Sequence, residues 1–301
     1  AFKAAVANGC DAVYLGMQRF GARAYSSNFD MESLSAVIEY AHLRDVKVYV
    51  TMNTIVFEDE IEDMRSQLEE LNNMGVDAII VQDLAVFDYV AKNFEDMEVH
   101  CSTQMGVDDI EGTLLLRDMG ANRIVMAREV GIDEVKDIKR QAGIPVEVFV
   151  HGALCVSYSG NCLMSGLIGY RSGNRGRCVG SCRKEYELID VTTGNVISRN
   201  YLLSTKDLNT IENIDQLRKM DSLKVEGRMK EPVYVANVID KYRKALDGHV
   251  DAEDVDQLTK TFNRTYTKGY MFGEDQKDIT NVSRPNNFGY EIGRITKCFK
   301  G

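Results

Sequence analysis

Short apolar runs rich in Val, Ile and Tyr recur along the chain, and segments of helical periodicity separate them. We predict strands at seven of these runs: Asp11–Gly16, Lys47–Asn53, Asp77–Asp83, Glu98–Thr103, Arg123–Ala127, Val146–Val150 and Leu223–Glu226. Most of the runs are almost continuous in apolar residues, which is typical of parallel strands buried on both faces.

Apolar residues at helical spacing predict helices in the segments between the strands. Helices are expected at Met31–Leu43, Ile61–Met74, Ile110–Met119, Ile132–Gln141 and Pro232–Leu246, with Val255–Tyr266 as a further candidate. Alternating strand–helix units of this kind form parallel sheets with right-handed crossovers.

The first residues, Ala1–Asn8, read as a helix, and a strand should come before it. With that strand restored, the chain would have eight strand–helix units. We therefore predict an α/β fold, a TIM-like (β/α)8 barrel that lacks its first strand because the chain is a fragment. An open doubly wound sheet is the alternative, although no Gly-x-Gly-x-x-Gly follows a strand to support its dinucleotide-binding form.

The alternation breaks once, over a long insertion before the last predicted strand. A hairpin is expected inside it, with strands Tyr186–Asp190 and Val196–Tyr201. We predict a barrel over residues 1–250 that includes a metal-binding insertion over 152–222. Residues 251–301 would form a helical extension and the start of a truncated β domain, opening at Tyr290–Lys300.

Four of the seven cysteines lie close together in this insertion: Cys155, Cys162, Cys178 and Cys182. Disulfides are not expected in a long chain with a large core and no export signal. The spacing Cys-x6-Cys-x15-Cys-x3-Cys predicts a four-thiolate metal site. The spacing alone does not decide which of two occupants, an iron–sulfur cluster or zinc, this site binds. The wide spacing favours an iron–sulfur cluster, whereas structural zinc usually comes with two short cysteine pairs.

Composition limits the partners. The chain has 301 residues, 44% of them apolar, and a net charge of −10, which argues against a basic coat for nonspecific nucleic-acid binding. One local basic run exists: Arg171, Arg175, Arg177, Arg183 and Lys184, with no acid between them. A solvated loop is its ordinary explanation, but its place among the cysteines favours a functional role.

Nothing in the sequence points to a membrane or to export. No apolar run is long enough to span a bilayer, and no signal pattern opens the chain. We expect a cytoplasmic protein without membrane contact, and the sequence gives no indication of its oligomeric state.

Polar side chains follow several predicted strands, at the edge where barrels carry their chemistry. We propose Arg128 and Arg228 as contacts for an anionic small molecule, because guanidinium groups bind carboxylates in pairs of hydrogen bonds. Asn53 and Gln104 are further substrate contacts. His151, Glu129 and Glu226 are candidate proton-transfer or orienting groups. Each of them alone is more often a helix cap or a loop hydrogen bonder.

Five stretches carry a resemblance to a known family: DAVYLG followed by RFGARAYSSNF, EVFVHGALCVSYSGNCLMS at Glu147–Ser165, RSGNRGRCVGSCR, LSTKDL at Leu203–Leu208 and KVEGR at Lys224–Arg228. The chain resembles the collagenase-like peptidase family over nearly its whole length, and most closely its tRNA-hydroxylating (5-hydroxyuridine synthase) branch. Some members of the family are reported as proteases of unassigned mechanism, and others hydroxylate tRNA or ribosomal RNA.

The resemblance implies a 4Fe-4S cluster on Cys155, Cys162, Cys178 and Cys182, prephenate or a similar dicarboxylate as hydroxyl source, and a tRNA wobble uridine as target. With RNA as the substrate, the basic run Arg171–Lys184 is expected to contact RNA phosphates. Zinc could replace the cluster in protein purified in air. A peptidase with a structural zinc site is the alternative, although no His-Glu-x-x-His occurs. A non-catalytic RNA-binding protein is the third.

Overall fold

The computed structural model describes residues 1–23 and 28–297, and its centre is a mostly parallel sheet. The strands β1 (Ala12–Gly16), β2 (Lys47–Met52), β3 (Ala78–Val81), β4 (Glu98–Cys101), β5 (Arg123–Val125) and β6 (Val146–Ala153) pair in chain order, each parallel to the next. Each predicted strand is present, the last of them as β10 (Ser222–Val225), which pairs with β6 in parallel.

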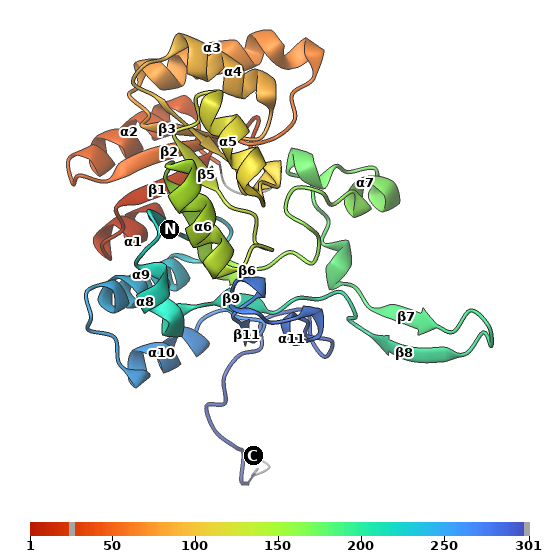
Figure 1. The fold of residues 1–301 in the computed structure, drawn as a ribbon. Helices are drawn as coiled ribbons and strands as arrows, with labels where there is room; N and C mark the ends of the chain where they lie inside the picture. Colours follow the sequence, from red (N-terminus) through yellow and green to blue (C-terminus); the bar gives the residue numbers. More distant parts are fainter. Residues whose placement is uncertain (24–27, 298–301) are drawn as a thin grey trace, which may run out of the picture.

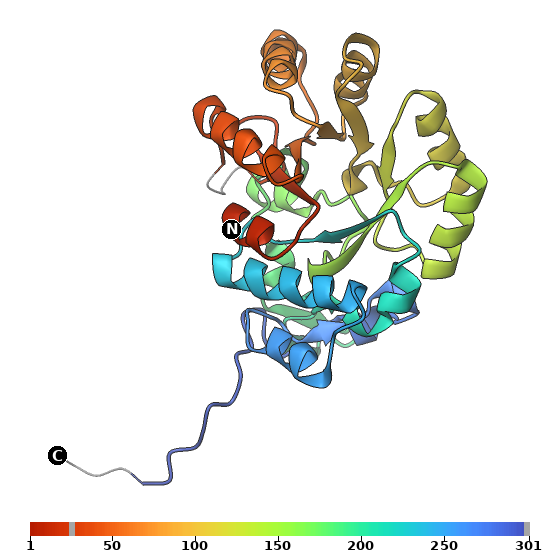
Figure 2. The same cartoon turned by 90° about the vertical axis from the view of Figure 1, so that its left-hand side faces the viewer.

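Helices lie around the outside of these strands (Figures 1 and 2). They are α1 (Phe2–Ala7), α2 (Met31–His42), α3 (Ile61–Asn73), α4 (Leu84–Asn93), α5 (Ile110–Asp118), α6 (Ile132–Ala142), α8 (Ile214–Leu217), α9 (Pro232–Leu246) and α10 (Ala252–Thr259). Their apolar faces bury a continuous core against the sheet, with side chains such as Leu34, Leu68 and Phe87 fully buried. This burial is the main stabilising contribution to the fold.

Strand β6 carries more neighbours than any other strand described. Its first half pairs with β5 and β10, and its end, His151–Ala153, pairs antiparallel with β9 (Asp207–Asn209). β9 also pairs with β11 (Tyr266–Thr267). Neither β9 nor β11 is predicted from the sequence, because two or three residues are too few to show a pattern.

The sheet curves, but among the described residues no ladder joins β10 to β1, so closure into a barrel is not shown. The two strands are connected by a side chain instead: the Tyr14 hydroxyl donates to the Val225 carbonyl at 3.3 Å. A cavity of about 910 Å³ lies between β1, β10, α1 and α9. The fold is therefore an α/β fold with a mostly parallel sheet, and the predicted eight-stranded barrel stays a prediction.

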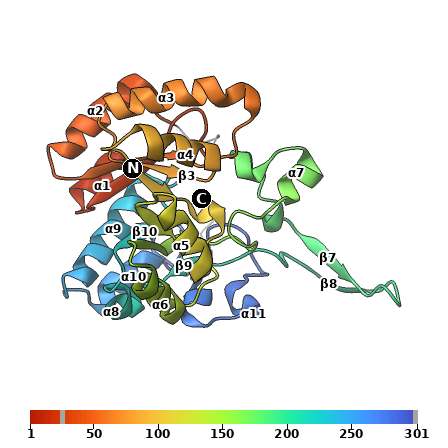
Figure 3. The ribbon, with the colours of Figure 1, turned by 45° about the horizontal axis from the view of Figure 1, so that its top comes forward.

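The insertion leaves the sheet after β6 and contains α7 (Met164–Gly169) and the predicted hairpin, β7 (Tyr186–Ile189) with β8 (Val196–Asn200). The hairpin projects away from the body of the molecule (Figures 1 and 3). It pairs with no strand of the large sheet within the described residues.

The C-terminal part differs from the prediction in two ways. The candidate helix Val255–Tyr266 is shorter, and Tyr266 instead starts β11. Of the predicted β element Tyr290–Lys300, residues 290–297 form no strand, and the remaining residues lie outside the described part. A strand forms only where a neighbour offers its backbone groups, and residues 290–297 pair with none. α11 (Gln276–Ile279) precedes this segment.

Within residues 1–23 and 28–297, no helix is both long and apolar enough to cross a membrane.

Candidate active site

Two arginines occupy the same position in two strand–turn–helix units. Arg128 follows the last residue of β5 by three positions, and Arg228 follows the last residue of β10 by three. In both units the next helix begins four residues later, at Ile132 and at Pro232. Parallel strands end at one edge of the sheet, so this repeated geometry brings both guanidinium groups to that edge.

Three further residues join the arginines in what we call the strand-end cluster: Tyr14, Arg23, Arg128, Glu226 and Arg228. The charges of Arg23, Arg128 and Arg228 all act on Tyr14 and on the Glu226 carboxylate, which places the five side chains in one neighbourhood. Burial raises the pKa of Tyr14, so its hydroxyl stays protonated as a donor.

Arg228 reaches into the cluster through a space that only glycine leaves open. Its Nη1 donates to Thr51 Oγ1 at 3.2 Å, whereas its buried Nη2 has no partner. A Cβ added to Gly16 would lie 2.1 Å from this Nη2. A buried guanidinium nitrogen without an acceptor is costly, so Arg228 presents a donor that is free for a ligand.

Glu226 is held as a carboxylate. Burial favours its neutral form, but the guanidinium groups of Arg23, Arg128 and Arg228 outweigh burial and hold its pKa below the usual range. Its Oε2 lies 3.4 Å from Arg23 Nη2. A carboxylate among three arginines is better suited to orienting them than to donating a proton.

Arg128 and Glu129 connect the cluster to the insertion. The Arg128 guanidinium lies 4.1 Å from the centre of the Phe149 ring, and its buried Nε has no partner. Glu129 Oε1 accepts from the Ser159 amide at 3.1 Å, whereas its buried Oε2 has none. Both side chains therefore keep one polar atom available.

The two predicted amide contacts differ in availability. Asn53 is used internally, because its Oδ1 accepts from the Ala22 amide at 3.1 Å and its Nδ2 donates to Ser102 Oγ at 3.2 Å. Gln104 keeps a buried Oε1 without a partner. This unpartnered oxygen supports a substrate contact for Gln104. No such atom supports one for Asn53, whose Oδ1 and Nδ2 are both bonded within the protein.

The His151 backbone lies near the end of β6, where its carbonyl accepts from the Glu226 amide at 2.9 Å, but its ring points to α9 and β11 and away from the strand-end cluster. The pairing of β6 with β10 shifts after Phe149, so Val150 is an extra residue and the alternation of faces is lost. The ring packs against Tyr234, Tyr242 and Tyr266, and both ring nitrogens lack partners.

Burial lowers the pKa of His151 to about 3, so the ring is neutral at physiological pH. The expected acid–base role of His151 therefore stays a prediction that no contact supports.

Sequence reasoning missed Arg23 and Tyr14 in the cluster. Tyr14 is the third residue of β1, within an apolar run that indicates a core strand only. Arg23 lies in the loop after β1, so the rule that selected Arg128 and Arg228 also applies to it. It could have been found from its place after a strand.

The four clustered cysteines are free thiols in the cysteine loop, residues 155–182. Burial raises the pKa of the Cys182 thiol, and nearby Cys155, Cys178 and Cys162 raise it further, so the four influence one another. The Gly180 amide donates to Cys178 Sγ at 3.4 Å, a contact that stabilises thiolates. The donors thus fit a metal or an iron–sulfur cluster in kind. In the described residues, however, no three metal-binding side chains already stand at ligating geometry.

The cysteine loop docks onto the strand ends closely. A Cβ on Gly160 would lie 1.9 Å from the Gln104 carbonyl oxygen, and Gly160 has a φ of +77°, so glycine is required twice over. The cysteine loop is therefore seated directly beside the strand-end cluster.

Two of the five basic residues predicted to contact RNA are engaged within the protein. Arg175 forms two hydrogen bonds to the Glu60 carboxylate, at 2.8 and 2.6 Å. Arg183 is bonded to Leu154, Ser204 and Thr205. Only Arg171, Arg177 and Lys184 are exposed, so the predicted basic surface is smaller than the sequence suggests.

The chain is similar to a family model and to several known proteins. Residues 1–281 match Peptidase family U32. The 23S rRNA 5-hydroxycytidine C2501 synthase of Escherichia coli (strain K12) is 35% identical, over 98% of this chain and 47% of that protein. The tRNA hydroxylation protein P1 of Bacillus subtilis (strain 168) is 34% identical, over 92% and 72%. A collagenase of Porphyromonas gingivalis (strain W83) is 35% identical, over 90% and 70%.

The fold and site thus define an α/β protein with an arginine-rich strand-end cluster and an adjoining loop of four free cysteines. The chain belongs to Peptidase family U32. It spans about half the length of the E. coli relative.

Proposed function

We propose that this chain is the catalytic part of an RNA hydroxylase, with a tRNA wobble uridine as its target. The observation that carries the proposal is that buried polar atoms of Arg128, Glu129 and Arg228 lack partners at the strand ends, against which the loop of four free thiols packs through Ser159 and Gly160. The names of the E. coli and B. subtilis relatives support RNA as the substrate.

The four cysteines would hold the cofactor: Cys155, Cys162, Cys178 and Cys182. A 4Fe-4S cluster bound there would supply one-electron redox chemistry. In protein purified in air, zinc could occupy the same thiols instead.

Arg128 and Arg228 would bind the carboxylates of prephenate or a similar dicarboxylate, because both present unused donors at the same edge of the sheet. Glu226 would orient the arginines. Glu129 would use its free Oε2 to hold a proton or a hydroxyl group of the substrate. Exposed Arg171, Arg177 and Lys184 would contact RNA phosphates, with the target base in a single-stranded loop.

The test is purification without oxygen, followed by analysis of iron, acid-labile sulfide and modified nucleosides. About four irons and four sulfides per chain, together with dicarboxylate-dependent gain of one oxygen atom by tRNA, are expected. Cys182→Ser should lose both the sulfide and the product. Zinc without sulfide, or an oxygen gain that persists in Cys182→Ser, would contradict the proposal.

The peptidase alternative has the name of the P. gingivalis relative in its favour. Its machinery is not supported by the geometry, since the only histidine near the cysteines in sequence, His151, makes no hydrogen bond to a thiol. Cleavage of a peptide substrate that survives replacement of the cluster cysteines would favour it. The third option, a non-catalytic RNA-binding protein, is separated from both enzymes by turnover.

A further inference from the structure

Arg183 follows Cys182 directly and is turned into the protein. Its Nη1 donates to Ser204 Oγ at 2.9 Å and also to the Thr205 carbonyl. Its Nη2 donates to Thr205 Oγ1 at 2.7 Å and to the Leu154 carbonyl at 3.1 Å. Leu154 is the residue immediately before Cys155, so one guanidinium group links the backbone next to Cys155 with the backbone next to Cys182.

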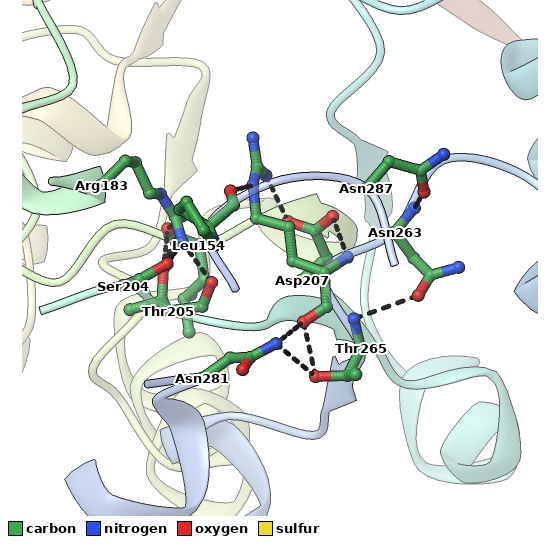
Figure 4. A network of polar contacts seen from close by, with 11 residues as sticks. Leu154, Arg183, Ser204, Thr205, Asp207, Asn263, Thr265, Asn281 and Asn287 are labelled. Carbon is green, nitrogen blue, oxygen red and sulfur yellow. Dashed lines mark hydrogen bonds and ion pairs between the residues drawn. The ribbon is translucent and has the colours of Figure 1, made fainter. Parts of the chain in front are cut away.

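Thr205 completes this link from the other side. Its hydroxyl donates to the same Leu154 carbonyl at 2.6 Å, and the residue is 1% exposed. We call Leu154, Arg183, Ser204 and Thr205 the clamp (Figure 4). Every polar atom of Arg183 that enters the clamp meets an acceptor, and such a fork of bonds fixes direction as well as distance.

The clamp rests on a platform that is itself tied to the rest of the molecule. The Asn281 amide donates to the Ser204 carbonyl at 2.7 Å, and the Lys206 amide donates to the Ile279 carbonyl at 2.8 Å. Asp207 forms a buried ion pair with Arg264 at 2.8 Å. Figure 4 shows Asp207 and Asn281 beside the clamp. The stretch Leu203–Leu208, to which the proposed reaction assigns no chemistry, therefore has a role as the base of the clamp.

We propose that Arg183 is a positioning residue, which keeps the backbone beside Cys155 and the backbone beside Cys182 together so that both thiols can bind one metal or cluster, and that it is not an RNA contact. The inference rests on the proposed function in one respect, the use of the four cysteines as ligands. Residues behind the ligands commonly set metal affinity, and their loss typically costs about 10- to 100-fold.

The experiment is a titration of the reduced chain with Co²⁺ under argon. Binding is monitored by the thiolate-to-cobalt charge-transfer absorption. Arg183→Met should lower the apparent cobalt affinity about 10- to 100-fold. It should also reduce the charge-transfer intensity by about a quarter, since three thiolates would remain where four were bound. Thr205→Val, which removes only the hydroxyl, should give a smaller loss in the same direction.

Lys184→Met is the matched control. It removes the same charge two residues from Cys182, but from an exposed side chain, so cobalt affinity and intensity should stay within about twofold. Arg183→Lys keeps the charge but lacks the planar fork, and should resemble Arg183→Met more than the wild type. Urea unfolding of each variant without metal identifies any variant that fails to fold, and Thr205→Val then serves in its place.

The outcomes separate the clamp from the proposed reaction, since the cobalt titration contains no RNA and no dicarboxylate. Binding of an RNA oligonucleotide is measured separately. If wild-type chain and Arg183→Met bind cobalt with equal affinity and equal intensity, the clamp is wrong and the hydroxylase proposal stands. If the wild-type thiols bind no cobalt, the ligand assignment fails for both. If Arg183→Met weakens binding of an RNA oligonucleotide and leaves the cobalt spectrum unchanged, Arg183 is an RNA contact after all.

Discussion

The strand-end cluster and the cysteine loop lie side by side, but they are held in place in different ways. The side chains of the cluster stand at or just after parallel strands, and the regular sheet sets their positions. Its arginines and Glu226 are more than half buried, and two of the polar atoms, Arg128 Nε and Arg228 Nη2, have no hydrogen-bond partner. The thiols sit in a loop with short helical turns, and two of the four are exposed.

This difference shows that folding alone can complete the strand-end cluster, whereas the cysteine loop also depends on its metal or cluster. The sheet sets the positions of Arg128 and Arg228, so we expect an anion to bind there with little rearrangement. The cysteine loop is tied down by a few arginine contacts, and in the described residues no metal geometry is complete without the ion. Cofactor loading should therefore order the loop, whereas it should leave the cluster unchanged.

The largest expected effect concerns the cluster. Arg228→Met removes the donor that lacks a partner, and we expect prephenate binding to weaken about 100-fold, or ~2.7 kcal/mol, by titration calorimetry. Arg19→Met is the control, because Arg19 pairs with Asp63 on the surface and is half exposed. Its effect should stay below about twofold. An equal loss in both variants would mean that general charge, not the cluster, binds the anion.

A smaller effect is expected from Gly16→Ala. The new methyl group would displace the Arg228 guanidinium, and prephenate binding should weaken about tenfold, or ~1.4 kcal/mol. Gly131→Ala, where a methyl group would meet no atom within 4 Å, is the control. In an Arg228→Met background, Gly16→Ala should add little, since the two changes act on one group. If the losses in prephenate binding of the two variants simply add in the double variant, displacement of Arg228 is not the cause of the Gly16→Ala effect.

For the loop, the Arg175–Glu60 pair predicts a dependence of stability on pH. The hydrogen bonds from Arg175 lower the pKa of Glu60 from 4.5 to about 2, against the effect of burial. The stabilisation is present above pH 4.5 and is lost as the pH falls through 2.

Because both side chains are partly exposed, we expect a loss of only ~1 kcal/mol in the free energy of unfolding between pH 5 and pH 2. Urea unfolding should show this slope in the wild type and a shallower one in Arg175→Met. If the free energy of unfolding depends on pH in the same way in the wild type and in Arg175→Met, the Arg175–Glu60 pair has no role in docking the loop.

The smallest effect is expected at the surface of the loop. Arg177→Ala should weaken RNA binding only a few-fold, and should reduce the slope of log K against log salt by about 0.7, the value for one contact with a single strand. Arg199→Ala on the exposed hairpin, where Arg199 pairs with Glu187, is the comparison. If the slope of log K against log salt is the same for Arg177→Ala and the wild type, the RNA-binding surface does not include Arg177 and lies outside the loop.

The sequence predicted the regular part of the fold because apolar runs and helical periodicity are local signals. The seven strands and the helix that begins at Pro232 are examples. It could not predict the side on which His151 lies, because one extra residue in β6 changes the face and leaves no trace in composition. The partners of Arg175 and Arg183 are distant in the chain, so a run of basic residues showed their charge and not their contacts.

The ends of the insertion meet at one point of the sheet. Gly152 and Ala153 pair directly with Leu208 and Asp207, so the chain leaves β6 and returns to it at the same place. The pairing of the sheet strands therefore does not depend on the length of the chain between them. We therefore expect residues to be added or removed at the tip of the hairpin, which pairs with no strand of the large sheet among the described residues, while the sheet keeps its register.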